Sequence, residues 1–190
     1  MEINLSGQVL QIAGAETAVS AALRARLVAS GAVEAEGLPD LLILSAPLMD
    51  ASGFDWDGLA ERARSVGASM KMQSRGRVVF LLAASAALPV RRQAELSARM
   101  AGLQAVMRTL AMTLAPEVAV NALGCGAIEA DGGLVSGDIE MIGHASVGRA
   151  GTVEEACDAA LFLCDRENAY LTGQILMADG GWSAGYGRNF

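Results

Sequence analysis

Several side chains in this sequence are of types that can act as nucleophiles, bases or metal ligands. Cys125 and His144 could form a thiolate nucleophile with its base, but no spacing argument links the two residues. Ser85 lacks the Gly-x-Ser-x-Gly pattern that exposes a serine nucleophile at a strand-to-helix turn. Cys157 and Cys164 stand seven residues apart in a predicted helix, where burial of small apolar side chains explains them better than metal binding. These residues therefore predict neither a catalytic site nor a metal site.

Two further features could bind an anion such as a phosphate. Gly14 lies between a predicted strand and a predicted helix, but one glycine at such a position favours a plain strand-to-helix turn. Arg91 and Arg92 could meet an anionic group, although adjacent arginines in a turn are more often solvated. His144, the single histidine, lies in a predicted glycine-rich loop, which favours a surface or packing role. None of these features by itself predicts a binding site.

Short apolar segments alternate with longer helical patterns along the chain. The run Leu41–Ser45 is continuously apolar and is bounded by Pro39 and Pro47, as in a central strand of a parallel sheet. Thr152 precedes Glu155 by three residues, which is the capping-box pattern of a helix start. The pattern predicts strands at 9–13, 41–45, 77–82, 118–123 and 175–178, and helices at 17–30, 57–71, 93–115 and 152–165. This alternation predicts an α/β fold, with a Rossmann-like, doubly wound parallel sheet in a single domain over residues 1–190.

Composition excludes several classes of protein. Of the 190 residues, 53% are hydrophobic and 18% are charged, so the chain is too apolar to be disordered. The longest uncharged apolar stretch, Val78–Val90, has 13 residues and contains Pro89, so it is too short to span a bilayer. A net charge of −7 disfavours nucleic acid and anionic lipid as partners. Because the first residues lack a basic signal segment and the three cysteines are an odd number, we expect a cytoplasmic protein without disulfides.

Two blocks of the sequence carry a family resemblance. The first is GRVVFLLAASAALPVRRQAELSARMAGLQAVMRTLAMTLAPEVAVNALGCGAI, and the second is GRAGTVEEACDAALFLCDRENAYLTGQILMADGGWS. Together they resemble the second half of a short-chain dehydrogenase/reductase, and the segments LTGQ at 171–174 and DGG at 179–181 are specific to that family. The first half, which contains GQVLQIAGAETAVSAAL and DLLILSAP, is similar to the family only in the arrangement of its segments. Because a strand, a helix and a strand usual in the family have no room before Asp40, we expect a truncated form of the family's fold.

The resemblance implies where a dinucleotide would bind in a catalytic relative. The family's phosphate loop has the form Thr-Gly-x-x-x-Gly-x-Gly, and Gly14 is the only one of its glycines present here. Ala18 and Ser20 replace the others, so their side chains would crowd the phosphates, and Glu16 adds negative charge beside them. The strand that supplies the ribose-binding residue is expected to be missing. We therefore expect no cofactor-binding residue in this chain.

The family's proton-transfer groups are a Tyr-x-x-x-Lys pair, a serine and an asparagine. The charge of the lysine lowers the pKa of the phenol, so that the phenolate can accept the proton of a substrate hydroxyl. The matching positions in this chain hold Leu96, Met100 and Ala83, and no asparagine occurs between Asn4 and Asn121. The resemblance therefore implies a chain without a catalytic residue, which does not carry out hydride transfer by itself.

The predicted helix at 93–115 is apolar nearly all round. One side would cover the sheet with a continuous stripe made of Leu96, Met100, Leu103, Met107, Leu110 and Leu114. The opposite side is also poor in charge, so we expect it to meet another subunit, the alternative being a well-filled core. Relatives pair through this helix and through a C-terminal block that corresponds to 152–165 and 171–178. The tail 181–190 either reaches across to a partner or frays.

These observations lead to three hypotheses about function. The first is a non-catalytic subunit, or pseudoenzyme, that pairs with an active, full-length member of the family in a hetero-oligomer of two plus two subunits. That complex would be an NAD-dependent dehydrogenase of a hydroxyacyl-CoA-type substrate, with NAD in the partner and no cofactor or metal in this chain. The second is a stand-alone Rossmann-fold binding or regulatory module without catalysis. The third is an active enzyme with a rearranged site.

Overall fold

The computed structural model describes residues 3–185, so the last part of the 181–190 tail, at 186–190, lies outside the described residues. Its central feature is a six-stranded sheet in the order β2-β1-β3-β4-β5-β9, in which every neighbouring pair is parallel. The strands are β1 (Val9–Gly14), β2 (Val33–Glu34), β3 (Leu41–Ser45), β4 (Arg77–Ala83), β5 (Ala119–Cys125) and β9 (Ile175–Ala178).

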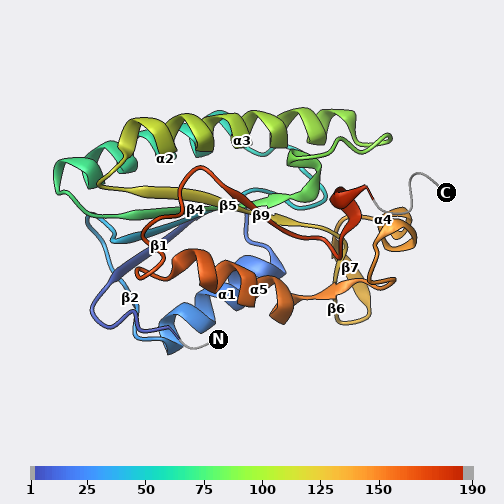
Figure 1. The fold of residues 1–190 in the computed structure, drawn as a ribbon, viewed down its shortest axis with the longest axis horizontal. Coiled ribbons are helices and arrows are strands. Elements are labelled where there is room, and N and C mark those ends of the chain that lie inside the picture. Colours follow the sequence, from blue (N-terminus) through green and yellow to red (C-terminus); the bar gives the residue numbers. More distant parts are fainter. Residues whose placement is uncertain (1–2, 186–190) are drawn as a thin grey trace.

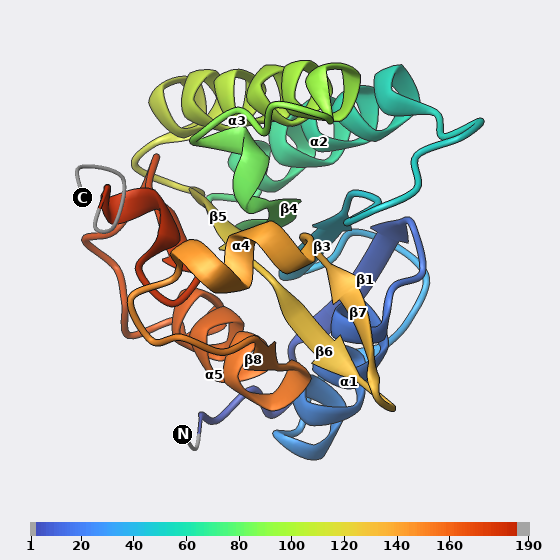
Figure 2. The same cartoon turned by 90° about the vertical axis from the view of Figure 1, so that its right-hand side faces the viewer.

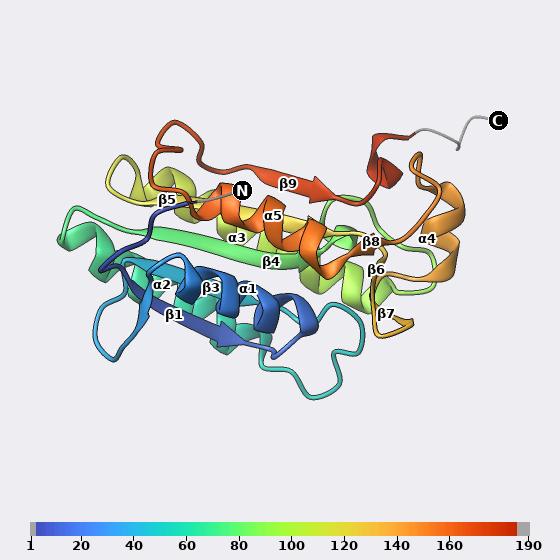
Figure 3. The same ribbon diagram turned by 90° about the horizontal axis from the view of Figure 1, so that it is seen from below.

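Four helices cover the two faces of this sheet. Helices α2 (Trp56–Met72) and α3 (Ala94–Leu114) lie on one face, above the sheet in Figure 1. Helices α1 (Ala18–Ala29) and α5 (Val153–Cys164) lie side by side on the other face, which Figure 3 shows from below. The predicted α/β fold with a doubly wound parallel sheet is confirmed.

The boundaries of the main elements follow the sequence pattern closely. Strands β3 and β9 begin and end where they were expected. Helices α1, α3 and α5 each begin one residue later and end one residue earlier than predicted, because the predicted ranges include the cap residues on both sides. Thr17 and Thr152 are the N-caps of α1 and α5, and both helices start with a capping box.

The structure contains elements that the sequence pattern did not predict. A three-stranded sheet in the order β7-β6-β8 is formed by β6 (Ile128–Ala130), β7 (Gly133–Ser136) and β8 (Gly151–Thr152). It lies beside helix α4 (Ile139–His144) at the carboxyl end of the main sheet, where Figure 2 shows them together. His144 therefore ends a short helix, and its expected place in a loop was wrong. These strands have two to four residues each, too few to show a periodicity.

The expected absence of a strand between α1 and Asp40 was also wrong. Strand β2 is present there, but it has only two residues, both exposed, and it forms the edge of the sheet. It pairs with β1 through Val9 and Leu10. The two-residue strand is followed by β3 on the other side of β1, so no further strand extends the sheet beyond this edge in the described part of the chain.

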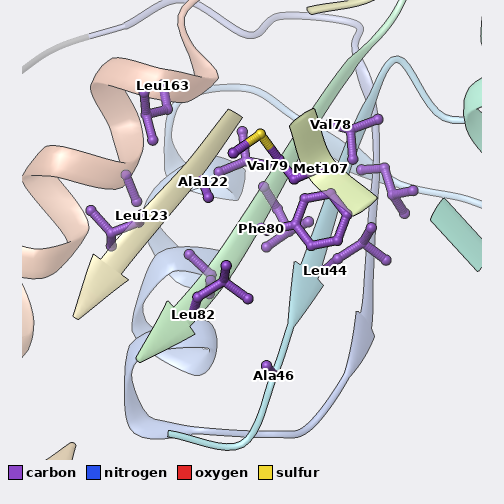
Figure 4. Close-up of a cluster of buried hydrophobic side chains, with 14 of the residues drawn as sticks. Leu44, Ala46, Val78, Val79, Phe80, Leu82, Met107, Ala122, Leu123 and Leu163 are labelled. Carbon is purple, nitrogen blue, oxygen red and sulfur yellow. The ribbon is translucent and has the colours of Figure 1, made fainter. Parts of the chain in front are cut away.

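The core is centred on β4, where all seven residues are buried. Phe80 on β4 shares one apolar cluster with Leu44 on β3 and Met107 on α3, as Figure 4 shows. The predicted stripe on α3 faces this cluster: each of its members is at most 8% exposed, namely Leu96, Met100, Leu103, Met107, Leu110 and Leu114. Packing of α3 on the sheet is therefore continuous along the helix. No helix within residues 3–185 combines the length and the apolar character needed to cross a bilayer.

Polar contacts anchor both ends of α5 to the rest of the molecule. At its start, Arg149 pairs with both carboxylate oxygens of Glu155, at 2.7 and 2.8 Å, while the Thr152 N–H donates to the same carboxylate at 2.9 Å. At its end, the guanidinium of Arg77, itself 8% exposed, donates to the backbone carbonyls of Leu163 and Asn168 at 3.3 Å. The first residue of β4 therefore holds the turn that follows α5.

Substitution of Arg77 tests the contact at the end of α5. We expect Arg77→Met to lower the free energy of unfolding by about 2 to 4 kcal/mol, because the buried carbonyls then lose a charged donor. Urea denaturation of the purified chain measures this loss. Arg64→Met is a suitable control, because Arg64 is an exposed arginine whose ion pair with Glu61 lies on the surface, and we expect a change below about 1 kcal/mol. Equal effects of both substitutions would contradict the structural role of Arg77.

The start of α5 predicts a dependence of stability on pH. The hydrogen bond from Arg149, and then that from the Thr152 backbone, lower the pKa of Glu155 from 4.5 to about 2. A lowered pKa in the folded state adds stability that is complete above about pH 4.5 and is lost as the pH falls towards 2. We expect Glu155→Gln, which removes only the charge, to lose less stability than the wild type over this range. Thermal melts at several pH values measure the difference, and parallel curves would contradict the prediction.

Candidate functional site

The carboxyl ends of β1, β3 and β4 form the edge of the sheet where an α/β protein of this topology binds its ligands. The matched glycine of the phosphate loop, Gly14, ends β1 at this edge with a φ of +103°. A Cβ at Gly14 would overlap the carbonyl oxygen of Ser45 on β3, and the N–H of Ala15 donates to that same oxygen at 2.8 Å. The close approach of β1 and β3 therefore accounts for glycine at position 14, and no bound phosphate is needed to explain it.

The N-terminus of α1 is capped by the side chains of Thr17 and Ser20. The Thr17 N–H donates to Ser20 Oγ at 2.9 Å, and the Ser20 N–H donates to Thr17 Oγ1 at 3.0 Å. Ser20 is 3% exposed, so its hydroxyl lies inside the turn. A phosphate binds to a helix N-terminus through free N–H groups, and here two of them already have partners. Ser20 therefore serves as a capping residue of α1. This role comes in addition to the crowding of a phosphate that was expected from its side chain.

The residues matched to the family's proton-transfer groups are packed in the core. Leu96 is 8% exposed, Met100 is fully buried and Ala83 is 4% exposed. Leu96 and Met100 point to the same side of α3, and both belong to the apolar cluster between this helix and the sheet. None of these three side chains can donate, accept or hold a proton. That these positions carry no catalytic residue stays a prediction, and the structure adds that their side chains are packed in the core.

Two buried hydroxyls lie near this edge and were not recognised as a pair from the sequence. Ser45 ends β3, and Ser85 lies in the short 3-10 helix at 84–86 that follows β4. Both serines are at most 1% exposed, and both Oγ atoms lack a hydrogen-bond partner among residues 3–185. Burial of an unpaired hydroxyl is uncommon, but a serine nucleophile also needs a base within hydrogen-bond reach, and the structure gives neither hydroxyl one.

The cysteines are unsuited to nucleophilic or metal chemistry. Burial raises the pKa of the Cys125 and Cys164 thiols to about 12 and that of Cys157 to about 11, so the thiolate is scarce at neutral pH. Cys125 is fully buried whereas His144 is exposed, so the structure does not bring them together as a nucleophile and its base. The described residues contain no group of three or more acidic, histidine or cysteine side chains arranged to hold a metal ion.

Two hollows flank the turn that carries Arg91 and Arg92. One, of about 500 Å³, lies between this turn and α4 and includes His144 and Trp182 in its wall. The other, of about 570 Å³, lies between the turn, the start of α3 and the segment 49–53. Arg92 borders both hollows and pairs across the first with Glu140 at 3.3 Å. The adjacent arginines are therefore exposed, as expected, and Arg92 connects the turn to α4 through its ion pair with Glu140.

Comparison with protein families and curated proteins identifies relatives. A family model described as enoyl-(acyl carrier protein) reductase matches residues 48–183. The 3-oxoacyl-[acyl-carrier-protein] reductase of Chlamydia pneumoniae is 38% identical over 93 residues, covering 47% of this chain and 38% of that protein. The Escherichia coli (strain K12) reductase of the same name is 27% identical over 146 residues, covering 70% of this chain and 60% of that protein. The chain thus spans less than two thirds of the length of these relatives.

Solved structures share the fold at lower identity. A gluconate 5-dehydrogenase from Burkholderia cenocepacia, in complex with NADP and tartrate, superposes with a TM-score of 0.78 at 18% identity, covering 95% of this chain and 97% of that one. A 3-ketoacyl-(acyl-carrier-protein) reductase from Brucella melitensis, complexed with NADH, has a TM-score of 0.77 at 21% identity, covering 95% of this chain and 100% of that one. At this identity the likeness establishes the fold alone.

The buried position of Met100 gives a direct test of the packed site. We expect Met100→Lys to lower the free energy of unfolding by about 3 kcal/mol or more, because an ammonium would have to enter a fully apolar environment. Met100→Leu conserves volume and should cost less than about 1.5 kcal/mol. Urea denaturation of both variants measures the contrast. A lysine variant as stable as the leucine variant would reveal a wet, roomy pocket at this position, against the packing described above.

Proposed function

The chain belongs to the short-chain dehydrogenase/reductase family, and we propose that it is a non-catalytic subunit that pairs with an active member of the same family. The observation that carries this proposal is the burial of Leu96 and Met100 where a phenol and an ammonium would be needed. A proton relay requires a polar, hydrated pocket at these positions. Tight apolar packing there leaves this chain without a group to accept the proton of a substrate alcohol.

The capping of the α1 N-terminus by Thr17 and Ser20 supports the absence of a dinucleotide in this chain. Thr17 and Ser20 satisfy each other's N–H groups, and Gly14 is accounted for by its contact with Ser45. The edge strand β2, with two exposed residues, offers little surface for the ribose of an adenosine. In the proposed complex NAD is bound by the partner, which also supplies the tyrosine and the lysine.

The described surface offers a helix face suited to a partner. On the side of α3 opposite the sheet, small residues are exposed at Ala98, Ala101, Gly102 and Ala105, and Met112 is 75% exposed. Small side chains let a second helix approach closely, and burial of an exposed methionine adds apolar area to the contact. In the C-terminal block Phe162 is exposed, and so is Tyr170, which immediately precedes the second part of the block. We propose that these two surfaces meet the partner in a hetero-oligomer of two plus two subunits.

The substrate of the complex is proposed from the relatives. Both curated reductases described above are named for 3-oxoacyl groups carried as thioesters on acyl carrier protein. A hydroxyacyl thioester, such as a hydroxyacyl-CoA, is the corresponding alcohol substrate. The narrower form of the proposal is 2-[hydroxy(phenyl)methyl]succinyl-CoA dehydrogenase of anaerobic toluene degradation, whose smaller subunit this chain resembles in length and in its missing motifs. The complex would act in the cytoplasm.

The second candidate is a stand-alone binding or regulatory module of the same fold. The two hollows beside Arg92, of about 500 and 570 Å³, favour it, because they have the size of small-molecule sites. A ligand of the isolated chain would raise its melting temperature by mass action, whereas the heteromer hypothesis requires a stable complex with a full-length family member.

Co-expression with a full-length family member tests the heteromer. We expect the two chains to co-purify and to show NAD-dependent alcohol oxidation that disappears when the partner's catalytic tyrosine is changed to phenylalanine. The isolated chain should show no melting shift with NAD. Activity that survives the tyrosine substitution would show that this chain carries the reaction itself.

Substitutions on α3 test the proposed surface. We expect Ala105→Glu to weaken the complex at least about tenfold, because a larger, charged side chain would have to be desolvated in a close helix contact. Ala35→Glu introduces the same change on an exposed loop after β2 and should leave assembly intact. Light scattering after size-exclusion chromatography measures both. Unchanged assembly in the folded Ala105→Glu variant would exclude this face of α3 from the interface.

A further inference from the structure

A polar cavity of about 430 Å³ lies at the amino-terminal end of the main sheet, opposite the edge where the family binds its ligands. Its wall is formed by residues that immediately precede β1, β3 and β4, and by the turn that follows α5. Three arginines, Arg75, Arg77 and Arg166, line it together with Asp40 and Gln8. The remaining wall residues, at positions 6, 7 and 76, are serine and glycine, so no hydrophobic side chain faces the cavity.

The charges in this wall leave a positive excess. Asp40 is the single carboxylate in it, and its two oxygens are engaged by the Arg75 guanidinium at 3.2 Å and by the Val9 N–H at 2.9 Å. Arg77 donates to neutral backbone carbonyls, so its charge is not cancelled by an ion pair. Arg166 has no side-chain hydrogen bond or ion pair among the residues that the structure describes, and it is exposed at the cavity mouth.

Acidic side chains also lie nearby, outside the wall itself. Asp165 and Glu167 line a neighbouring hollow that shares Arg166 with this cavity. The carboxylate of Asp165 accepts the Glu167 N–H at 3.0 Å and acts on Arg77 through space. The wall therefore contains three arginines and one carboxylate, and both oxygens of that carboxylate already have partners.

A buried donor without an acceptor gives a second, independent indication. The Nε2 atom of Gln8 is buried and makes no hydrogen bond within residues 3–185. An unsatisfied buried donor is costly and uncommon in folded proteins, so it calls for an acceptor at this place. The Gln8 side chain borders the cavity, but its Nε2 atom is enclosed, so the amide would have to rotate toward the cavity to donate to a ligand there.

We propose that this cavity binds a phosphate group of a small metabolite. A phosphate presents several strong acceptor oxygens, which suit the planar fork of an arginine and a neighbouring amide donor. Arg166 would contact the phosphate, Arg77 would add a second positive charge from the wall, and the Gln8 amide, rotated toward the cavity, would donate to one oxygen. The volume lies within the range of small-molecule sites, so a group larger than phosphate alone fits. This site is independent of the proposed pairing with a catalytic partner.

Titration of the full chain with inorganic phosphate and pyrophosphate tests the proposal. Isothermal titration at constant ionic strength, with sodium chloride as the balancing salt, separates specific binding from screening. We expect saturable binding and a rise in melting temperature with phosphate. In Arg166→Gln, which changes an exposed side chain, the dissociation constant should rise about tenfold or more. Arg91→Gln removes the same charge from a different hollow and should bind like the wild type.

Gln8→Met provides the second variant. It replaces the unpaired donor by an apolar group of similar length, so the unliganded chain should melt at the same temperature or higher, while phosphate binding weakens. Absence of saturable binding to the wild type would overturn the proposal. Equal weakening in Arg91→Gln and Arg166→Gln would also overturn it, because phosphate would then respond to net charge and not to this cavity.

Discussion

The packing of α3 against the central strands is the interaction on which the rest of the structure depends. Its inward side is aliphatic from Leu96 to Leu114, and it meets β4, a strand without an exposed residue. Apolar burial of this extent dominates the stability of a domain. The same packing occupies the place where members of the short-chain dehydrogenase/reductase family position a tyrosine and a lysine. In the function proposed for this chain, stability and the missing proton relay have one physical cause.

The connection between β1 and α1 is likewise held by internal contacts. Gly14 allows the backbone to approach Ser45, and Thr17 and Ser20 close the helix N-terminus. In a nucleotide-binding relative, the glycines and the free N–H groups of this turn would face phosphates. Here the N–H groups of Thr17 and Ser20 are bonded to side-chain hydroxyls of the same turn, whereas three arginines line a cavity at the opposite end of the sheet. The function proposed for the chain, assembly with a catalytic partner, agrees with this redistribution of polar groups.

Much of the fold could be predicted because its main elements have strong local signals. The run Leu41–Ser45 is long enough and apolar enough to be a buried strand, and the Thr152–Glu155 pair marks the start of α5. The two-residue strand β2, the small sheet and α4 were missed, since a few residues of mixed polarity carry no measurable period. At the site, the substitutions at Leu96 and Met100 were visible in the sequence, but the unpaired hydroxyls of Ser45 and Ser85 were not, because satisfaction of a hydroxyl depends on neighbours from other elements.

The amino-acid sequence alone determined the order of the main strands and helices. It also determined the apolar stripe of α3 and the identity of the residues at the family's motif positions. These are local properties, carried by periodicity, capping residues and motif spacing. Only the tertiary structure decided that Met100 is fully buried, that Ser20 serves as a cap and that Arg77 holds the turn after α5. It also brought Gln8, Asp40 and Arg166 to one cavity. Parallel strands place residues that are distant in sequence at the same end of a sheet, and no local pattern records that convergence.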